Sequence, residues 1–212
     1  MTGRPGLRER KKQQTRLAIS QVATAMFIER GFDRVTVAEV AEAAQVSVNT
    51  IFNYFSSKED LFFDRAEEVE DAPSRMVRER RRGESALEAL RRNFRQTMKE
   101  GDPLFRRNLR PFLATVEASP ALKARARLLL ERCEQRLTRT LVEETGARPD
   151  DPTPRVVAAL FTALLSLLTQ EYQIRLLRGE PDQEYRAALS RMGERGFELL
   201  KPGVGNYCRR PT

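Results

Sequence analysis

Apolar side chains recur along the chain at intervals of three and four residues, which is the spacing of one face of an α-helix. The first such stripe consists of Ile19, Val22, Ala23, Met26 and Phe27. Gly31 follows it, and glycine commonly ends a helix because it tolerates a left-handed backbone. No segment alternates apolar and polar residues as a half-buried strand does. The sequence therefore predicts an all-α protein.

Two short helices are predicted between residues 36 and 58. Thr36 and Glu39 have the spacing of a capping box, in which each side chain satisfies a backbone N–H of the other residue at a helix start. Ser47 is a favourable first residue for the second helix. Ile51 lies where a hydrophobic staple would fix the angle between the two helices. The pattern indicates two helices joined by a tight turn.

The second of these helices carries polar side chains on a face that packing does not need. Asn49 and Asn53 are four residues apart and share this face, while Ile51 and Phe55 point inward. Asparagine can hydrogen-bond N6 and N7 of adenine together, and threonine, as at Thr50, can contact a thymine methyl group. This arrangement is typical of a helix-turn-helix that enters the major groove of DNA.

Residues 15 to about 61 resemble the DNA-binding domain of the TetR family of bacterial transcriptional regulators. The resemblance rests on the segment AMFIERGFDRVTVAEVAEAAQVSVNTIFNYFSSKEDL, and it covers about a quarter of the chain. It implies an all-helical homodimer with an N-terminal helix-turn-helix domain and a variable C-terminal helical ligand-binding and dimerisation domain. It also implies a repressor that a small-molecule effector releases from a palindromic operator in double-stranded DNA.

Eight side chains in this segment are candidate DNA contacts: Thr36, Ser47, Asn49, Thr50, Phe52, Asn53, Tyr54 and Lys58. By resemblance, Thr36, Tyr54 and Lys58 contact phosphates, whereas Asn49, Thr50 and Asn53 meet bases or nearby backbone. The family often has glycine where Gln45 and Asn49 stand, and tyrosine where Phe52 stands. Phe52 lacks a hydroxyl for a phosphate, and Asn49 adds a base-reading group. The operator therefore does not follow from the family.

The net charge of +8 suits a polyanionic partner. Six basic residues lie before residue 17, with Glu9 as the only acidic residue among them: Arg4, Arg8, Arg10, Lys11, Lys12 and Arg16. We expect residues 1–14 to form a flexible basic arm, which either lies along DNA or only keeps the chain in solution. The helix-turn-helix domain is expected over residues 15–56.

Residues 57–202 are predicted to form the ligand-binding and dimerisation domain, followed by a disordered tail over residues 203–212. Capping boxes and helix breakers divide this region into further helices. A box beginning at Ser56 opens a helix that Pro73 is expected to end. A similar box begins at Ser85.

The helix predicted from Pro154 to Arg178 is apolar nearly all round, so it needs burial on several sides. With the last helix, it fits a four-helix bundle formed by two subunits across a two-fold axis. The alternative is burial within one subunit. The candidate dimer contacts are Leu160, Leu164, Leu168, Leu189, Met192 and Gly196.

The resemblance also implies an effector pocket among the middle helices. Its candidate lining residues, which are otherwise plain core, are Phe94, Met98, Phe105, Leu109, Phe112, Val116, Phe161 and Leu165. The side chains polar or soft enough to orient a ligand are Thr115, Cys133, Thr162 and Thr169. The arginines between residues 91 and 110 either select an anionic ligand or form a solvated face. The effector itself is unknown.

The composition argues against an enzyme. The chain has no histidine, which excludes a Ser–His or Cys–His pair and a histidine-ligated zinc. No glycine-rich phosphate loop is present. Cys133 and Cys208 are far apart and lack other ligand types nearby in sequence, so we expect no metal and no cofactor. The chain has no uncharged apolar run of 18 residues and no secretory leader, so we expect a cytoplasmic protein with no membrane partner.

Two functional hypotheses remain. A ligand-released repressor predicts a pocket of several hundred Å³ in the ligand domain. An interaction protein that serves a protein partner predicts a filled core and an exposed apolar patch outside the dimer face. Activation instead of repression is a third alternative, and the sequence does not decide it.

Overall fold

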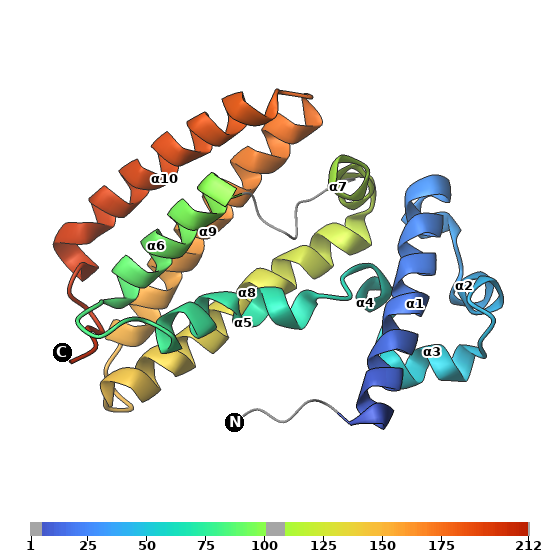
Figure 1. Ribbon diagram of the computed structural model, residues 1–212, viewed down its shortest axis with the longest axis horizontal. Helices are drawn as coiled ribbons and strands as arrows, with labels where there is room; N and C mark the ends of the chain where they lie inside the picture. Colours follow the sequence, from blue (N-terminus) through green and yellow to red (C-terminus); the bar gives the residue numbers. More distant parts are fainter. Residues whose placement is uncertain (1–5, 101–108, 212) are drawn as a thin grey trace. The chain divides into compact units, whose positions relative to one another are not determined.

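The computed structural model describes residues 6–100 and 109–211, and helices are the only regular elements in those ranges (Figure 1). The all-α prediction is therefore confirmed. The chain divides into two compact units, residues 1–66 with 111–125 and residues 67–110 with 126–212. The division differs from the predicted domains, because a segment from the middle of the chain joins the N-terminal helices.

The first unit holds the N-terminal helices and a later pair. They are α1 (Leu7–Arg30), the 3-10 turn η1 (Phe32–Arg34), α2 (Val37–Ala43), α3 (Val48–Tyr54), α4 (Lys58–Phe62), most of α7 (Leu109–Ala118) and the first turns of α8 (Pro120–Thr145). Their shared core includes Phe27, Ile51 and Leu122, each no more than 1% exposed. Because α1 is helical from Leu7, most of the expected flexible arm is instead part of this unit.

Local sequence signals set the helix starts in this unit. Glu39 and Thr36 form the predicted capping box, with the Thr36 N–H donating to Glu39 Oε2 at 2.7 Å and the Glu39 N–H donating to Thr36 Oγ1 at 3.2 Å. Ser47 caps α3 by accepting from the Thr50 N–H at 3.0 Å. Gln45 takes a positive φ of 56° in the turn between them, a conformation that costs a non-glycine residue free energy. The two helices and tight turn are as predicted.

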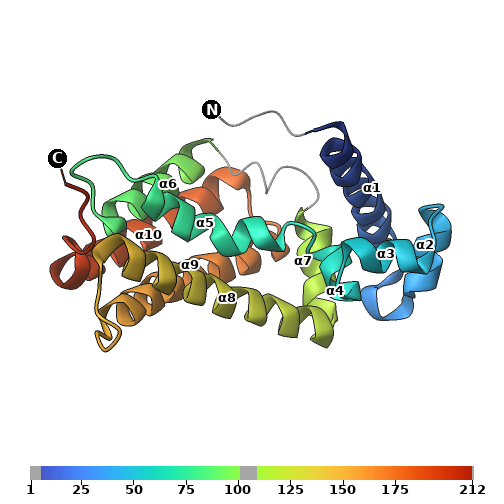
Figure 2. The same cartoon turned by 90° about the horizontal axis from the view of Figure 1, so that it is seen from below.

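The second unit holds α5 (Ala66–Arg78), α6 (Ala86–Glu100), most of α8, α9 (Thr153–Leu177) and α10 (Asp182–Val204). α9 and α10 lie side by side in opposite directions, with α6 beside α10 (Figures 1 and 2). Two glycines of α10 permit this packing, because an added Cβ would meet Phe94 of α6 at Gly193 and Leu164 of α9 at Gly196. α5 is tied to α8 through a hydrogen bond from Arg78 to Thr140.

Among the described helices, α9 is the one long and apolar enough to cross a membrane by length and composition. Val157, Ala158 and Phe161 of α9 are each 1% exposed or less and lie in the core of the second unit. A core helix of a helical bundle has this property without contacting lipid. Packing within the unit accounts for this buried part of α9, although only 33% of its most apolar window is buried.

Two predicted helix boundaries are wrong. Pro73 lies inside α5, and Ser57 rather than Ser56 caps α4 by accepting from the Asp60 N–H at 3.2 Å. Pro73 has no N–H to donate to the carbonyl of Val69 one turn earlier. Val69 is 45% exposed, and the helix continues through Pro73 to Arg78.

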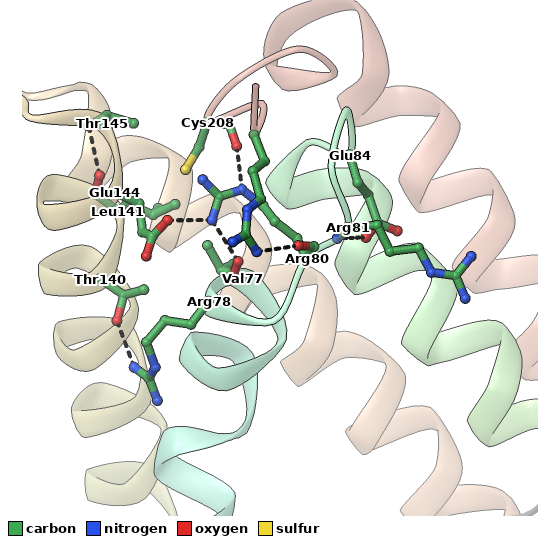
Figure 3. A network of polar contacts seen from close by, with 11 residues as sticks. Val77, Arg78, Arg80, Arg81, Glu84, Thr140, Leu141, Glu144, Thr145 and Cys208 are labelled. Atoms are coloured by element: carbon green, nitrogen blue, oxygen red, sulfur yellow. Dashed lines mark hydrogen bonds and ion pairs between the residues drawn. The ribbon is translucent and has the colours of Figure 1, made fainter. Parts of the chain in front are cut away.

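The segment expected to be a disordered tail is packed on the second unit. α10 continues to Val204, and Cys208 is buried beside the guanidinium of Arg80, which donates to its carbonyl at 2.8 Å (Figure 3). The backbone of Arg210 also pairs with Gly83 and Glu84, at 2.9 and 3.0 Å. We call residues 205–211 the C-terminal strap. It lies against the loop between α5 and α6.

Candidate functional site

The ends of α3 are held by contacts within the first unit. Ser47 caps its start, and the Arg16 guanidinium of α1 donates to the carbonyl of Tyr54 at its end. Arg16 also donates to the Asp64 carbonyl at 3.1 Å and lies 4.3 Å from the centre of the Phe55 ring. Ile51 and Phe55 are 1% and 2% exposed. These contacts fix which face of α3 is turned outward.

Four side chains occupy the outward face of α3. Asn49 and Asn53 are exposed, as predicted, and Phe52 and Val48 are 52% and 38% exposed. Neither asparagine side chain makes a hydrogen bond within the described part of the chain. The face thus presents two free amides beside two apolar groups.

The hydroxyl groups at the helix starts already have partners. Thr36 Oγ1 donates to Glu39 Oε2 at 2.8 Å, and the hydroxyls of Ser47 and Thr50 are 2.9 Å apart. The Thr36 N–H and the Arg30 guanidinium, both donating to Glu39, lower the pKa of that carboxyl to about 2. Thr36 and Ser47 are exposed and Thr50 is half-buried. Their hydroxyls must share existing bonds in order to contact DNA.

Tyr54 and Lys58 are less available than the resemblance implied. Tyr54 is half-buried against the core of the first unit. Lys58 Nζ donates to the Phe32 carbonyl at 2.6 Å and lies 4.3 Å from the centre of the Phe32 ring. The Lys58 ammonium is therefore engaged within the unit, away from the outward face of α3.

Positive charge instead gathers on the first turns of α1. Arg8, Arg10, Lys11 and Lys12 are all exposed there. They precede Arg16 by one to two turns, and Arg16 reaches the end of α3. The basic turns consequently lie near the C-terminal end of α3. By contrast, the only charged residues between positions 35 and 57 are Glu39 and Glu42.

A pocket of about 180 Å³ lies in the second unit. It is lined by Met76, Leu90, Asn93, Phe94, Thr97, Met98, Leu165, Leu168, Thr169, Tyr172, Tyr185, Arg186 and Leu189, which belong to α5, α6, α9 and α10. Phe94, Met98 and Leu165 were predicted lining residues, and Thr169 a predicted polar one. The lining is mostly apolar, and its polar members are Asn93, Thr97, Thr169, Tyr172, Tyr185 and Arg186.

The pocket lining includes two tyrosines that sequence reasoning missed, Tyr172 and Tyr185. The rings of Tyr172 and Tyr185 meet edge to face at 5.4 Å. The Tyr185 hydroxyl donates to Asp182, and Arg186 Nε donates to the same carboxylate at 2.7 Å. Burial raises the pKa of both tyrosines, so each stays a neutral hydroxyl at physiological pH. The spacing of Asp182, Tyr185 and Arg186 on one helical face is the one available sequence signal.

Several predicted pocket residues lie elsewhere. Phe112 and Val116 belong to the core of the first unit, where the Phe112 ring stacks on Phe62 with centroids 4.2 Å apart. Phe161 is 1% exposed within the core of the second unit and does not line the pocket. Leu109 does not line it either, and Phe105 lies outside the described residues.

The predicted dimer contacts are divided between core and surface. Leu168 and Leu189 are 6% and 3% exposed and line the pocket, so within a single chain they are already covered. Leu164 packs against Gly196, and Met192 is half-buried. Leu160 is 40% exposed. The other large apolar side chains exposed on α9 are Val156, Leu167 and Ile174.

The arginines of α6 are paired with carboxylates. Arg91 and Arg95 both bind Glu194 of α10, at 2.5 and 2.7 Å. Arg95 and Arg91 together lower the pKa of Glu194 to about 2. Arg92 pairs with Glu84 at 2.8 Å. The described arginines of α6 therefore support the interpretation of a solvated, ion-paired face.

Family comparisons match both units. Residues 19–64 match the model for bacterial regulatory proteins of the tetR family, and residues 84–203 match the model of the MftR C-terminal domain. The HTH-type transcriptional regulator TcmR of Streptomyces glaucescens is 30% identical over 98% of this chain and 92% of its own length. LuxR of Vibrio harveyi, also an HTH-type transcriptional regulator, is 46% identical over 24% of this chain and 23% of its own.

Solved structures share the fold. NalD, the secondary repressor of the MexAB-OprM multidrug efflux pump in Pseudomonas aeruginosa, aligns over 87% of this chain and 97% of its own with a TM-score of 0.56 and 19% identity. GusR of Salmonella enterica aligns over 91% and 96% with a TM-score of 0.54 and 16% identity. With the matched family models and the full-length relative, the helix-turn-helix places this chain in the TetR family of DNA-binding transcriptional regulators.

Proposed function

We propose that the protein is a cytoplasmic, homodimeric repressor that leaves a palindromic operator when a small molecule binds its second unit. The observation that carries this proposal is the outward face of α3. Its two amides make no hydrogen bond within the described residues, and Phe52 is half exposed beside them. Packing does not explain these side chains, whereas a major groove offers each of them a partner.

The DNA surface combines this face with the basic turns of α1. Asn49 and Asn53 read base edges, with Thr50 and Phe52 alongside. Arg8, Arg10, Lys11 and Lys12 attract phosphates, since residues 35–57 contribute no positive charge. Thr36, Ser47 and Tyr54 lie at the margins of the surface. Lys58 contributes only if its ammonium leaves the Phe32 carbonyl.

A second copy of the chain covers the exposed apolar row of α9. Val156, Leu160, Leu167 and Ile174 recur at helical spacing and are 40–54% exposed. Leu199 of the neighbouring α10 is 63% exposed. Two such helix pairs around a two-fold axis form a four-helix bundle that removes these groups from water.

The pocket between α6, α9 and α10 receives the effector. At about 180 Å³ it is smaller than the several hundred Å³ that we expected, and an apolar cavity of roughly 150 Å³ holds benzene. Arg186 is balanced by Asp182. The pocket therefore suits a compact, largely apolar molecule whose polar group meets Tyr172, Asn93 or Thr97. An open pocket favours an effector over the filled core expected of a pure protein-interaction module.

The first test is selection of bound sites from a random pool of duplex DNA, with purified protein at moderate salt. A palindromic motif is the expected result. Asn49→Ala should then lose discrimination at one or two base pairs, by ~1–3 kcal/mol each. Lys11→Ala should instead weaken binding to all sequences evenly and reduce the salt dependence. Salt-sensitive binding with no motif would contradict the proposal.

The dimer is tested separately by sedimentation. Leu160→Glu together with Leu167→Glu should give a folded monomer at micromolar concentration, because each charge would be buried in the bundle. Val69→Glu, which alters an equally exposed apolar residue on α5, is the control and should leave the dimer intact. A monomeric wild-type chain at that concentration would contradict the homodimer.

A further inference from the structure

The outward face of α3 consists of two matched pairs of side chains. Val48 and Phe52 are four residues apart, as are Asn49 and Asn53, so each pair lies along the helix axis. The pairs are adjacent because their members are neighbours in sequence. Four residues rise about 6 Å along a helix, which is close to two base-pair steps of about 3.4 Å each. The two members of each pair can therefore meet base pairs that are two steps apart.

The charges of this region restrict what the face can read. Arginine or lysine bidentate to guanine O6 and N7 is the commonest specific contact in the major groove. Between residues 35 and 57 the only charged side chains are those of Glu39 and Glu42. Glu39 is held in the capping box and paired with Arg30. α3 itself carries no charged side chain and thus offers no cation to guanine, since Glu39 and Glu42 both belong to α2.

The side chains that are present match the groups of A·T pairs. Asparagine pairs with adenine N6 and N7, and apolar side chains contact the thymine methyl group. Phe52 is 52% exposed although Ile51 and Phe55 already fill the core side of the helix. An apolar ring left in water beside two free amides has a complementary surface in a row of adenines and thymine methyl groups.

We propose that α3 reads A·T pairs, with Val48 and Phe52 against thymine methyl groups and Asn49 and Asn53 on adenine edges. This rests on the proposed function. The operator half-site consequently has an A·T core where α3 enters the major groove. The phosphates beside it are held by the basic turns of α1. Phe52 is the residue that determines specificity for thymine over cytosine and uracil.

The test uses the full-length protein and the motif obtained by selection. Each thymine of one half-site is replaced in turn by deoxyuridine, which removes only the 5-methyl group and keeps the base pair. Wild-type protein should bind about three- to fivefold more weakly at one or two of these positions, the loss expected for one exposed methyl group. Uracil placed outside the half-sites should have no effect.

Protein variants assign the effect to side chains. In Phe52→Ala the penalty for uracil should disappear at the position that Phe52 contacts, while Phe52→Leu should retain most of it. Val69→Ala, at an exposed apolar residue of α5, should keep the full wild-type penalty. Asn49→Ala should lose at least fivefold in preference for adenine at its own position.

The outcomes separate this proposal from the proposed function. Two results would overturn the proposal that α3 reads A·T pairs while leaving sequence-specific DNA binding intact. One is a palindromic motif with a G·C core, and the other is an A·T core at which replacing thymine by deoxyuridine never weakens binding. A uracil penalty that persists unchanged in Phe52→Ala would overturn the role of Phe52. Failure to recover any motif would instead overturn the proposed function.

Discussion

A single methyl group added at Gly193 is expected to disturb both the packing of α10 against α6 and the size of the pocket. Gly193 lies on α10 opposite α6, and a Cβ built there would be 3.0 Å from Cε2 of Phe94 and closer still to two other ring atoms. Carbon atoms in favourable contact are about 3.5–4.0 Å apart. Gly193→Ala therefore forces the Phe94 ring to move by at least half an ångström.

The magnitude follows from two opposed effects. Alanine is better than glycine in a helix interior by about 1 kcal/mol, whereas overpacking a core costs about 1–3 kcal/mol. Phe94 packs against Phe197 with centroids 5.7 Å apart on one side and lines the pocket on another. The pocket offers open space toward which the ring can yield. We expect a net loss of about 1–2 kcal/mol of unfolding free energy, together with a smaller pocket.

Urea unfolding followed by circular dichroism measures the first effect, and a shift in effector affinity measures the second. Gly203→Ala is the control, because it lies on the same helix with nothing within 4 Å of the added Cβ, and it should change stability by less than about 0.5 kcal/mol. Phe94→Leu in the Gly193→Ala background should recover part of the loss. Equal or greater stability of Gly193→Ala relative to Gly203→Ala would refute the close-packing argument.

Three further predictions concern single side chains. Because the pKa of Glu39 is lowered to about 2, its contribution to stability is complete above about pH 4.5 and is lost as the pH falls toward 2, so Glu39→Gln should flatten this acid limb in urea titrations between pH 2 and 6. Burial raises the pKa of Cys133 to about 11, so iodoacetamide at pH 7.5 should leave Cys133 unmodified by mass spectrometry until urea unfolds the second unit; rapid labelling of the native protein would contradict its burial. Arg80→Met should cost about 3 kcal/mol, since Arg80 is 3% exposed and donates to Cys208, Val77 and Glu144; a change below 1 kcal/mol in its urea midpoint analysis would contradict that.

The sequence predicted best what depends on neighbours along the chain. The capping box at Thr36, the cap at Ser47 and the inward positions of Ile51 and Phe55 follow from spacings of three and four residues. The outward direction of Asn49 and Asn53 follows from the same periodicity. The helix-turn-helix could be predicted from the sequence for this reason.

Features that depend on contacts between residues far apart in the sequence could not be predicted in the same way. Periodicity placed Phe112 on an apolar helix face but could not show that this face stacks on Phe62, fifty positions earlier. Tyr172 and Tyr185 meet only because α9 and α10 turn back on each other at Gly179. Leu168 and Leu189 have the spacing of interface residues, yet the pocket side of the subunit buries them. The composition suggested a disordered tail, because it does not show that the buried Arg80 donates a hydrogen bond to the Cys208 carbonyl.

The C-terminal strap has a consequence for the order in which the protein folds during synthesis. The core of the second unit includes Cys208 and contacts Tyr207, so it cannot be completed until these residues have left the ribosome. The first unit needs nothing beyond residue 125. Since domains generally fold as units during translation, we expect the first unit to form once residue 125 has emerged and the second to be completed only after residue 208 has emerged.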